Sequence, residues 1–99
     1  LYFEIKAELP NKMIVGLDKN VAEITITGNK KWQGVKLSPS DFMNFEMKPR
    51  ENWTGIMELR LDDEETLRPP RNSGMKARKL GAQWQGSPPE FRYLRWLVE

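Results

Sequence analysis

The chain has 99 residues, a formal net charge of +2, 38% hydrophobic residues and 30% charged residues. These values are typical of one globular domain rather than of a disordered chain. No apolar run approaches the roughly 18 residues that a membrane span needs. Cys and His are both absent, which removes disulfides, thiolate chemistry, the commonest general base and the commonest metal ligand. We therefore expect a single, non-enzymatic domain over residues 1–99, with no cofactor, no metal and no membrane partner.

Strict alternation at the start of the chain predicts a half-buried strand over residues 1–9. One face carries apolar side chains and the other carries polar side chains or Tyr2; the apolar set is Leu1, Phe3, Ile5, Ala7 and Leu9. The chain starts with Leu1 rather than Met, and Leu1 already fits the strand pattern. We therefore expect it to have been processed or cut from a longer protein.

Three further short strands are predicted before residue 38. They cover residues 13–17, 21–27 and 32–37, and turn-forming residues separate them at 18–20 and 28–31. Connections this short favour neighbouring antiparallel strands. The first four strands are therefore expected to form an antiparallel meander.

A short helix is predicted after the fourth strand. Ser38 is a good N-cap, Pro39 suits the first helical position, and an acidic Asp41 in the first turn favours the helix dipole. Phe42 and Phe45 lie three residues apart, so both would face the sheet. A fifth strand is expected within residues 52–61, where apolar and charged residues alternate again.

The last third of the chain is predicted to hold an exposed loop over residues 62–74 and a basic, aromatic segment over residues 75–99. Residues 75–85 fit either a helix or irregular structure. A capping pattern at residues 87–90 then predicts a last helix, with Phe91, Leu94 and Leu97 in one stripe. The expected fold class is α+β: an antiparallel sheet of four to five strands, packed on one side by one or two short helices.

Charge is distributed unevenly along the chain. Residues 50–65 hold 2 basic and 6 acidic residues, and residues 66–99 hold 7 basic and 2 acidic residues. Such asymmetry favours a polyanionic partner or a charge-paired interface. The alternatives are two solvated faces, or the two segments docking on each other.

Aromatic side chains next to cations form the candidate binding site. Single-stranded nucleic acids are bound by stacking of bases on aromatic rings and by pairing of phosphates with Lys and Arg. The candidate residues are Lys30, Lys31, Trp32, Lys36, Lys76, Arg78, Lys79 and Trp84. Trp32 is predicted to share a strand face with Lys36, opposite Val35 and Leu37. The alternative role of these tryptophans is to fill the core or a protein interface.

The junction Gly34-Val35-Lys36-Leu37-Ser38-Pro39-Ser40-Asp41-Phe42 resembles the strand-to-helix junction of the positive-cofactor type transcriptional coactivators, which bind single-stranded DNA. The resemblance covers about 25 residues, 22–46, with Lys30 and Lys31 as the basic loop and Phe42 as the aromatic residue. It implies that Lys30, Lys31, Trp32 and Lys36 lie along a concave nucleic-acid face. This sequence departs from the family at Pro49, which cuts the helix short, and in the residues after Pro49, which have no counterpart there.

The sequence therefore predicts a nucleic-acid-binding module, for single strands of DNA or RNA rather than duplex. The alternative is a protein–protein interaction domain excised from a larger or viral assembly. In that case the basic segment and the aromatic last helix would dock on a protein partner.

Overall fold

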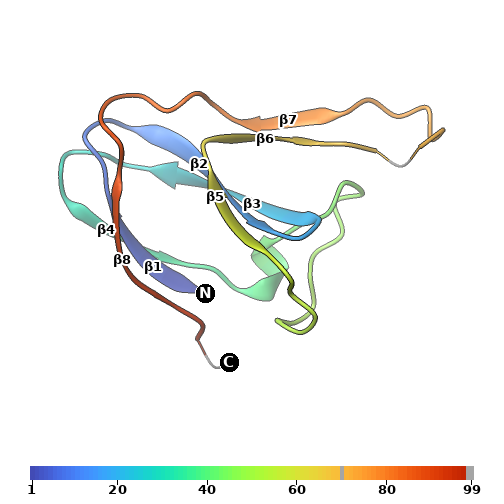
Figure 1. The fold of residues 1–99 in the computed structure, drawn as a ribbon, viewed down its shortest axis with the longest axis horizontal. Helices are drawn as coiled ribbons and strands as arrows, with labels where there is room; N and C mark the ends of the chain where they lie inside the picture. The colour runs from blue at the N-terminus through green and yellow to red at the C-terminus, as the bar shows by residue number, and fades with distance from the viewer. Residues whose placement is uncertain (70, 98–99) are drawn as a thin grey trace.

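The protein, for which a computed structural model describes residues 1–69 and 71–97, is all-β in these residues (Figure 1). One 3₁₀ turn, η1 (Pro39–Asp41), interrupts the strands. The strands are β1 (Tyr2–Lys6), β2 (Asn11–Leu17), β3 (Asn20–Ile26), β4 (Trp32–Lys36), β5 (Leu59–Asp62), β6 (Glu64–Leu67), β7 (Arg78–Gly81) and β8 (Glu90–Arg95). The predicted α+β class is therefore wrong.

The strands form three antiparallel sheets, ordered β4–β1–β8, β3–β2–β5 and β6–β7. All five strands that we predicted before residue 62 overlap observed strands. β2 and β3 form the expected hairpin, from Asn11↔Ile26 to Leu17↔Asn20. The meander as a whole is wrong, because β1 pairs with β4 and β8 instead of β2. The first four strands are thereby divided between two sheets.

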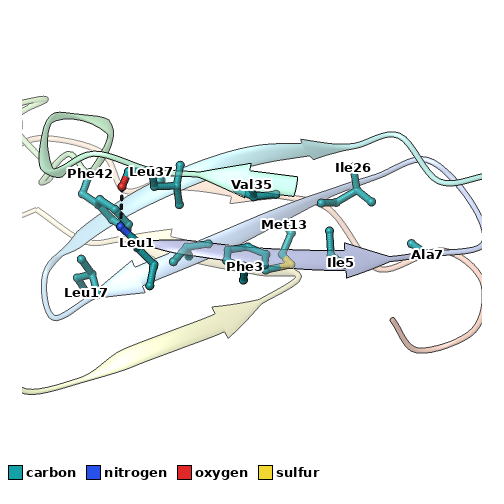
Figure 2. Close-up of a cluster of buried hydrophobic side chains, with 12 residues drawn as sticks. Leu1, Phe3, Ile5, Ala7, Met13, Leu17, Ile26, Val35, Leu37 and Phe42 are labelled. Carbon is teal, nitrogen blue, oxygen red and sulfur yellow. Dashed lines mark hydrogen bonds between the residues drawn. The ribbon is translucent and has the colours of Figure 1, made fainter. Parts of the chain in front are cut away.

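The main core lies between the two three-stranded sheets (Figure 2). Alternate residues of β1 point into it, and Phe3 and Ile5 are fully buried. This inward row continues before and after β1 through Leu1 and Ala7. Val35 and Leu37 lie beside this row in the same sheet, in and just after β4. The members that oppose it come from the β3–β2–β5 sheet and are Met13, Val15, Leu17, Ala22 and Ile26; Phe42 completes the core. The apolar face predicted for residues 1–9 is thus confirmed through Ala7, whereas Leu9 is exposed.

The β6–β7 hairpin covers the opposite face of the β3–β2–β5 sheet. Ile14 is fully buried there, and it clusters with Val21, Phe45 and Leu67, with Leu80 partly buried against them. β2 is therefore buried on both faces, which explains its nearly continuous apolar sequence. In Figure 1 the hairpin runs along the top of the molecule, and its loop extends beyond the end of β3.

The helix predicted from residue 38 stops after the turn η1. The Asp41 carboxylate accepts a hydrogen bond from the Ser38 N–H at 2.7 Å, and Pro39 is the first residue of the turn. Phe42 then has extended backbone angles, and Met43 bridges to Val21. Phe42 enters the main core, whereas Phe45 enters the second cluster. Two aromatic side chains that are buried in different cores cannot lie on one helix face. The helix therefore ends after η1, and the backbone becomes extended at Phe42.

The predicted last helix is strand β8, and part of the predicted 62–74 loop is strand β6. β8 pairs with β1 on the side opposite β4, and β6 pairs with β7 from Glu64↔Gly81 to Leu67↔Arg78. Lys79 Nζ lies 3.5 Å from a Glu64 carboxylate oxygen across this ladder. The acidic and basic segments therefore dock on each other here, as one of our alternatives stated. Within the described residues, no helix has the length and apolar character that crossing a membrane requires.

Candidate nucleic-acid interface

The outer face of the β4–β1–β8 sheet is polar and aromatic. Because Phe3 and Ile5 point inward, Tyr2, Glu4 and Lys6 point outward. The registers place one residue of β4 and one of β8 beside each of them. The resulting three rows, named here the cation–aromatic face, are Lys36–Tyr2–Arg95, Gly34–Glu4–Arg92 and Trp32–Lys6–Glu90.

Trp32 lies on this face with its ring beneath two cations. The Arg92 guanidinium carbon is 3.9 Å from the ring centroid, and Lys6 Nζ is 5.1 Å from it. Trp32 is half-buried rather than freely exposed, because these side chains cover part of the indole. A ligand that stacks at this site would therefore contact the guanidinium plane of Arg92, which itself packs on the indole of Trp32. Such stacks are attractive because of the ring's negative π-face.

A second ring–guanidinium stack lies two residues away. The Arg95 guanidinium carbon is 4.8 Å from the centroid of Tyr2. Gly34 makes room for this tyrosine, because a Cβ at Gly34 would lie only 3.1 Å from the Tyr2 hydroxyl oxygen. The Tyr2 side chain can thus pack across β4, over Gly34, instead of pointing away from the sheet.

Glu4 forms hydrogen bonds with one residue of each stack. Its Oε2 accepts a hydrogen bond from the Tyr2 hydroxyl at 2.6 Å, and its Oε1 accepts one from Arg92 Nε at 2.7 Å. These two hydrogen bonds, that of Tyr2 first, lower the pKa of the Glu4 carboxyl, while the same contact raises the pKa of Tyr2. The ionised carboxylate therefore orients both Tyr2 and Arg92.

A β-bulge in β8 places both arginines on this face. Between the pairs Tyr2↔Arg95 and Glu4↔Arg92, β8 contains one residue more than β1. Tyr93, in the bulge, has a φ of 59° and is 60% exposed. Without the extra residue, Arg92 and Arg95 would point to opposite faces, because they lie three apart. A left-handed conformation is uncommon for a bulky residue, so the bulge is a specific feature of this strand.

Four of the eight predicted site residues lie on or beside the cation–aromatic face. Trp32 and Lys36 are members of its rows. Lys30 and Lys31 are exposed in the turn before β4, at the Trp32 end. The Lys30 N–H donates to the Ala7 carbonyl at 2.9 Å, which fixes this turn against the chain that follows β1.

The other four predicted residues lie elsewhere. Lys76 precedes β7 and is exposed; Arg78 stacks 5.9 Å from the Phe45 ring centroid, and Lys79 pairs with Glu64. Trp84 is half-buried against the main core, and its Nε1 donates to the Ser87 carbonyl at 2.9 Å. The structure therefore does not bring the eight residues into one site.

Apart from Trp32 and Lys36, sequence reasoning omitted the aromatic and basic members of the face: Tyr2, Lys6, Arg92 and Arg95. A signal for the first two was present, because the alternation over residues 1–9 already placed them opposite the core. No local signal identified the two arginines, because their spacing fitted a helix.

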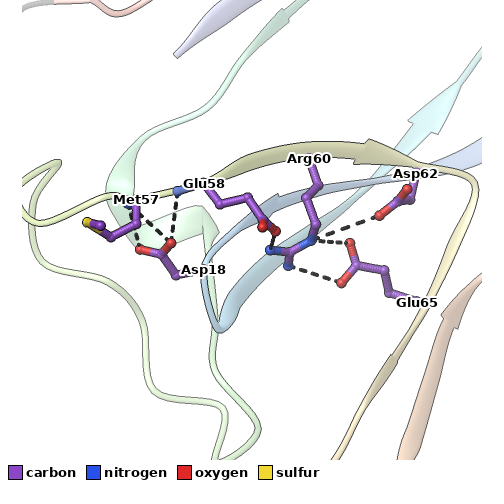
Figure 3. A network of polar contacts seen from close by, with 6 residues as sticks. All are labelled: Asp18, Met57, Glu58, Arg60, Asp62 and Glu65. Carbon is purple, nitrogen blue, oxygen red and sulfur yellow. Dashed lines mark hydrogen bonds and ion pairs between the residues drawn. The ribbon is translucent and has the colours of Figure 1, made fainter.

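A separate polar cluster surrounds Arg60 on β5 (Figure 3). Its guanidinium lies over Gly16, the register partner on β2, where a Cβ would overlap it. Nε and Nη2 each lie 3.1 Å from one carboxylate oxygen of Glu65, and Nη1 lies 2.5 Å from Glu58. Asp62 is more distant, at 4.0 Å. This cluster joins β5 to β6 and so supports the hairpin over the second core.

The pKa values of the Glu65 and Asp62 carboxyls are shifted in opposite directions. Burial raises the pKa of Glu65, but hydrogen bonds from Arg60 and Asp62 outweigh it, so the pKa of Glu65 is lowered. A hydrogen bond with Glu65, together with burial, raises the pKa of Asp62. Glu65 is therefore the anionic partner of Arg60, and Asp62 is the group that binds a proton first as the pH falls.

We expect Arg60→Met to lower the free energy of unfolding by about 1–3 kcal/mol at ~pH 7, because Glu65 stays partly buried without its cation. A lowered folded-state pKa stabilises the protein above the unfolded value and loses that effect as pH falls through the folded value. The cost of the substitution should thus shrink toward ~pH 3. Urea denaturation at both pH values measures it. Lys48→Met, which breaks the exposed pair with Glu46, is the control, and an equal, pH-independent cost of Arg60→Met would contradict this role.

The described residues contain no group of three or more acidic side chains arranged to hold a metal ion. Comparisons with family models, curated proteins and solved structures gave no match for this chain. The resemblance to the positive-cofactor coactivators stays a prediction from the sequence. Any function must therefore be argued from the surface itself.

Proposed function

We propose that the cation–aromatic face binds single-stranded nucleic acid. The observation that carries this proposal is the pair of stacks, Arg92 on Trp32 and Arg95 on Tyr2, on one open sheet face. Unpaired bases stack on aromatic rings and on guanidinium planes. The Arg92 side chain is 40% exposed, so it offers a plane to a base while the indole supports it from below.

Four cations around these stacks are available for phosphates. Within the described residues, Lys30, Lys31, Lys36 and Arg95 form no ion pair, whereas Lys6 pairs with Glu90 and Arg92 with Glu4. Lys36 and Arg95 lie at one end of the face, and the two turn lysines lie at the other. A strand that crosses the face would thus meet unpaired cations on both sides of the stacks. We assign Arg92 to stacking and the three unpaired lysines to phosphates, whereas Arg95, which stacks on Tyr2 and has no ion pair, serves both roles.

The preference for single strands follows from the same geometry. A duplex presents its bases edge-on within the grooves, and its stacked bases are not accessible to a flat sheet. Stacking on a guanidinium plane requires a base that has left the helix. Duplex DNA is therefore expected to meet only the phosphate-binding cations.

We expect a short single-stranded oligonucleotide to bind at ~50 mM salt and to weaken steeply as salt rises, because phosphate contacts release counterions. With four cations engaged, the log–log slope should be about −3. Fluorescence anisotropy of a labelled oligonucleotide measures both quantities, and a duplex of the same length is the control. Undetectable binding at ~50 mM salt, or equally tight duplex binding, would contradict the proposal.

A protein partner is the second candidate, favoured by the exposure of large side chains on and after β8. Tyr93, Leu94 and Trp96 are 60%, 49% and 47% exposed. β8 is also an edge strand of its sheet among the described residues. If the oligonucleotide titration gave no binding, this surface would be the remaining candidate.

A further inference from the structure

A cavity of about 390 Å³ opens between strands β5 and β8, away from the cation–aromatic face. Its floor is Met13 of the main core and its side is Leu61 of β5. The full lining is Met13, Leu61, Asp62, Asp63, Trp84, Gly86, Pro88, Pro89 and Phe91. β5 and β8 are the edges of their sheets in the described chain, so this cavity lies at the open side of the main core.

The aromatic walls of this cavity are held in place. The Trp84 side chain donates to the Ser87 carbonyl at 2.9 Å, and the Trp84 backbone N–H donates to Asp63 at 3.3 Å. The adjacent Gln85 is bonded to the buried Asn11 through both its N–H, at 2.7 Å, and its carbonyl, at 3.0 Å. Phe91 is 41% exposed. The loop that carries Trp84 is therefore positioned before any ligand arrives.

The charge of this cavity is negative. Asp63 supplies a carboxylate, which accepts hydrogen bonds from the Glu64 and Trp84 N–H groups, and none of the described residues that line the cavity is basic. An aromatic, apolar cavity with a carboxylate at its wall favours a cation that is itself partly apolar. A plain ammonium is strongly hydrated and loses that hydration on entry, whereas methyl groups reduce this cost. Methylated ammonium groups are bound in proteins by aromatic side chains in this way.

We propose that this cavity binds a methylated lysine side chain presented by an extended peptide. The edges of β5 and β8 favour a peptide over a free ammonium ion, because an extended backbone can add to an exposed strand edge while one side chain enters the cavity. Trp84 and Phe91 contact the methyl groups, and Asp63 supplies the opposite charge. This proposal is independent of the nucleic-acid proposal, since no lining residue belongs to the cation–aromatic face.

The test compares four probes by calorimetric titration: a peptide with one trimethyllysine, the same peptide with unmodified lysine, the same peptide with a neutral tert-butyl isostere, and tetramethylammonium alone. We expect the trimethyllysine peptide to bind about tenfold more tightly than each of the other three. Equal affinity for the neutral isostere would overturn the proposal, because the cavity would then recognise only apolar shape. Equal affinity for tetramethylammonium would overturn the assignment to a peptide.

Two variants locate the binding. Trp84→Phe keeps an aromatic ring against the core but offers a weaker π-face, and Asp63→Asn removes one charge with little change in shape. Each should weaken the trimethyllysine peptide severalfold while thermal melts show a folded protein. Lys36→Ala, on the cation–aromatic face, should leave this affinity unchanged. Unchanged affinity in both cavity variants, or no binding of the peptide by the unaltered protein, would overturn the proposal.

Discussion

Phe3→Ala should lower the free energy of unfolding by about 3–5 kcal/mol, because it removes a fully buried ring and leaves a cavity. Phe3 has no exposed surface, lies opposite Val35 in the β1–β4 ladder and is 6.0 Å from the Phe91 ring. A domain of this size is stabilised by only about 5–15 kcal/mol in total. The loss should therefore lower Tm by on the order of 20 °C.

Tyr2→Ala is the matched control for this substitution. Tyr2 is the adjacent residue of β1 and points to the opposite face, where it loses one hydrogen bond and one stack. Its cost should stay near 1–2 kcal/mol, about the sum of these contacts. Urea denaturation of both variants measures the difference. Equal costs would contradict the assignment of the two faces of β1.

The comparison between Phe3 and Tyr2 also shows what local sequence pattern can predict. Alternation determines which side chains of a strand share a face, and it placed Phe3 and Tyr2 correctly. It carries no information on which strand lies alongside. β1 pairs with residues 32–36 and 90–95, both distant in the chain, and these long-range pairings were not predicted.

The prediction of a helix after residue 87 was wrong for a specific reason. Residues spaced three apart share a helix face, and Arg92 and Arg95 have this spacing. A bulged strand also places residues three apart on one face. The extra residue in the bulge, at Tyr93, puts Arg95 on the same face of the sheet as Arg92. A bulge depends on the partner strand, here β1, so the sequence of β8 alone could not distinguish the two structures.

Phe42 and Phe45 show a related limit of pattern reasoning. Their spacing and the capping signals before them favour a helix, and the first turn does form as η1. Tertiary packing then overrides the local preference, because the two rings are buried in separate cores. The second core depends on the β6–β7 hairpin. We had assigned the residues of β6 to a loop and had left residues 75–85, which contain β7, open between a helix and irregular structure.

The candidate site was predicted in part. Trp32 and Lys36 were placed on one outward strand face from alternation alone, and the structure brings them to the same face. Their partners Arg92 and Arg95 come from a strand that was not predicted. The basic residues Arg78 and Lys79, grouped with them by charge, instead contact Phe45 and Glu64. Charge in the sequence identified cations but could not show which of them have local partners.

The double substitution Lys36→Ala/Arg95→Ala should weaken single-stranded oligonucleotide binding by about 100-fold at ~50 mM salt. Each lost phosphate contact lowers the log–log slope by about 0.7, which corresponds to about tenfold in affinity at this salt concentration. The slope should thus become less steep by about 1.4. The curves of variant and parent should approach each other toward 1 M salt, with a remaining difference from the lost Arg95–Tyr2 stack. Stability should change little, since neither residue forms an ion pair with a described residue and only the Arg95–Tyr2 stack is lost.

The variant Arg71→Ala/Lys76→Ala is the control, because it removes the same charge from two exposed residues of the β6–β7 loop. Salt-dependent anisotropy titrations of parent and both variants, with thermal melts, measure the outcome. If binding occurs on the cation–aromatic face, the loop variant should retain the affinity and slope of the parent. A loss of affinity in the loop variant with normal binding by Lys36→Ala/Arg95→Ala would place the nucleic acid on the hairpin, and the face formed by β4, β1 and β8 would lose its assigned role.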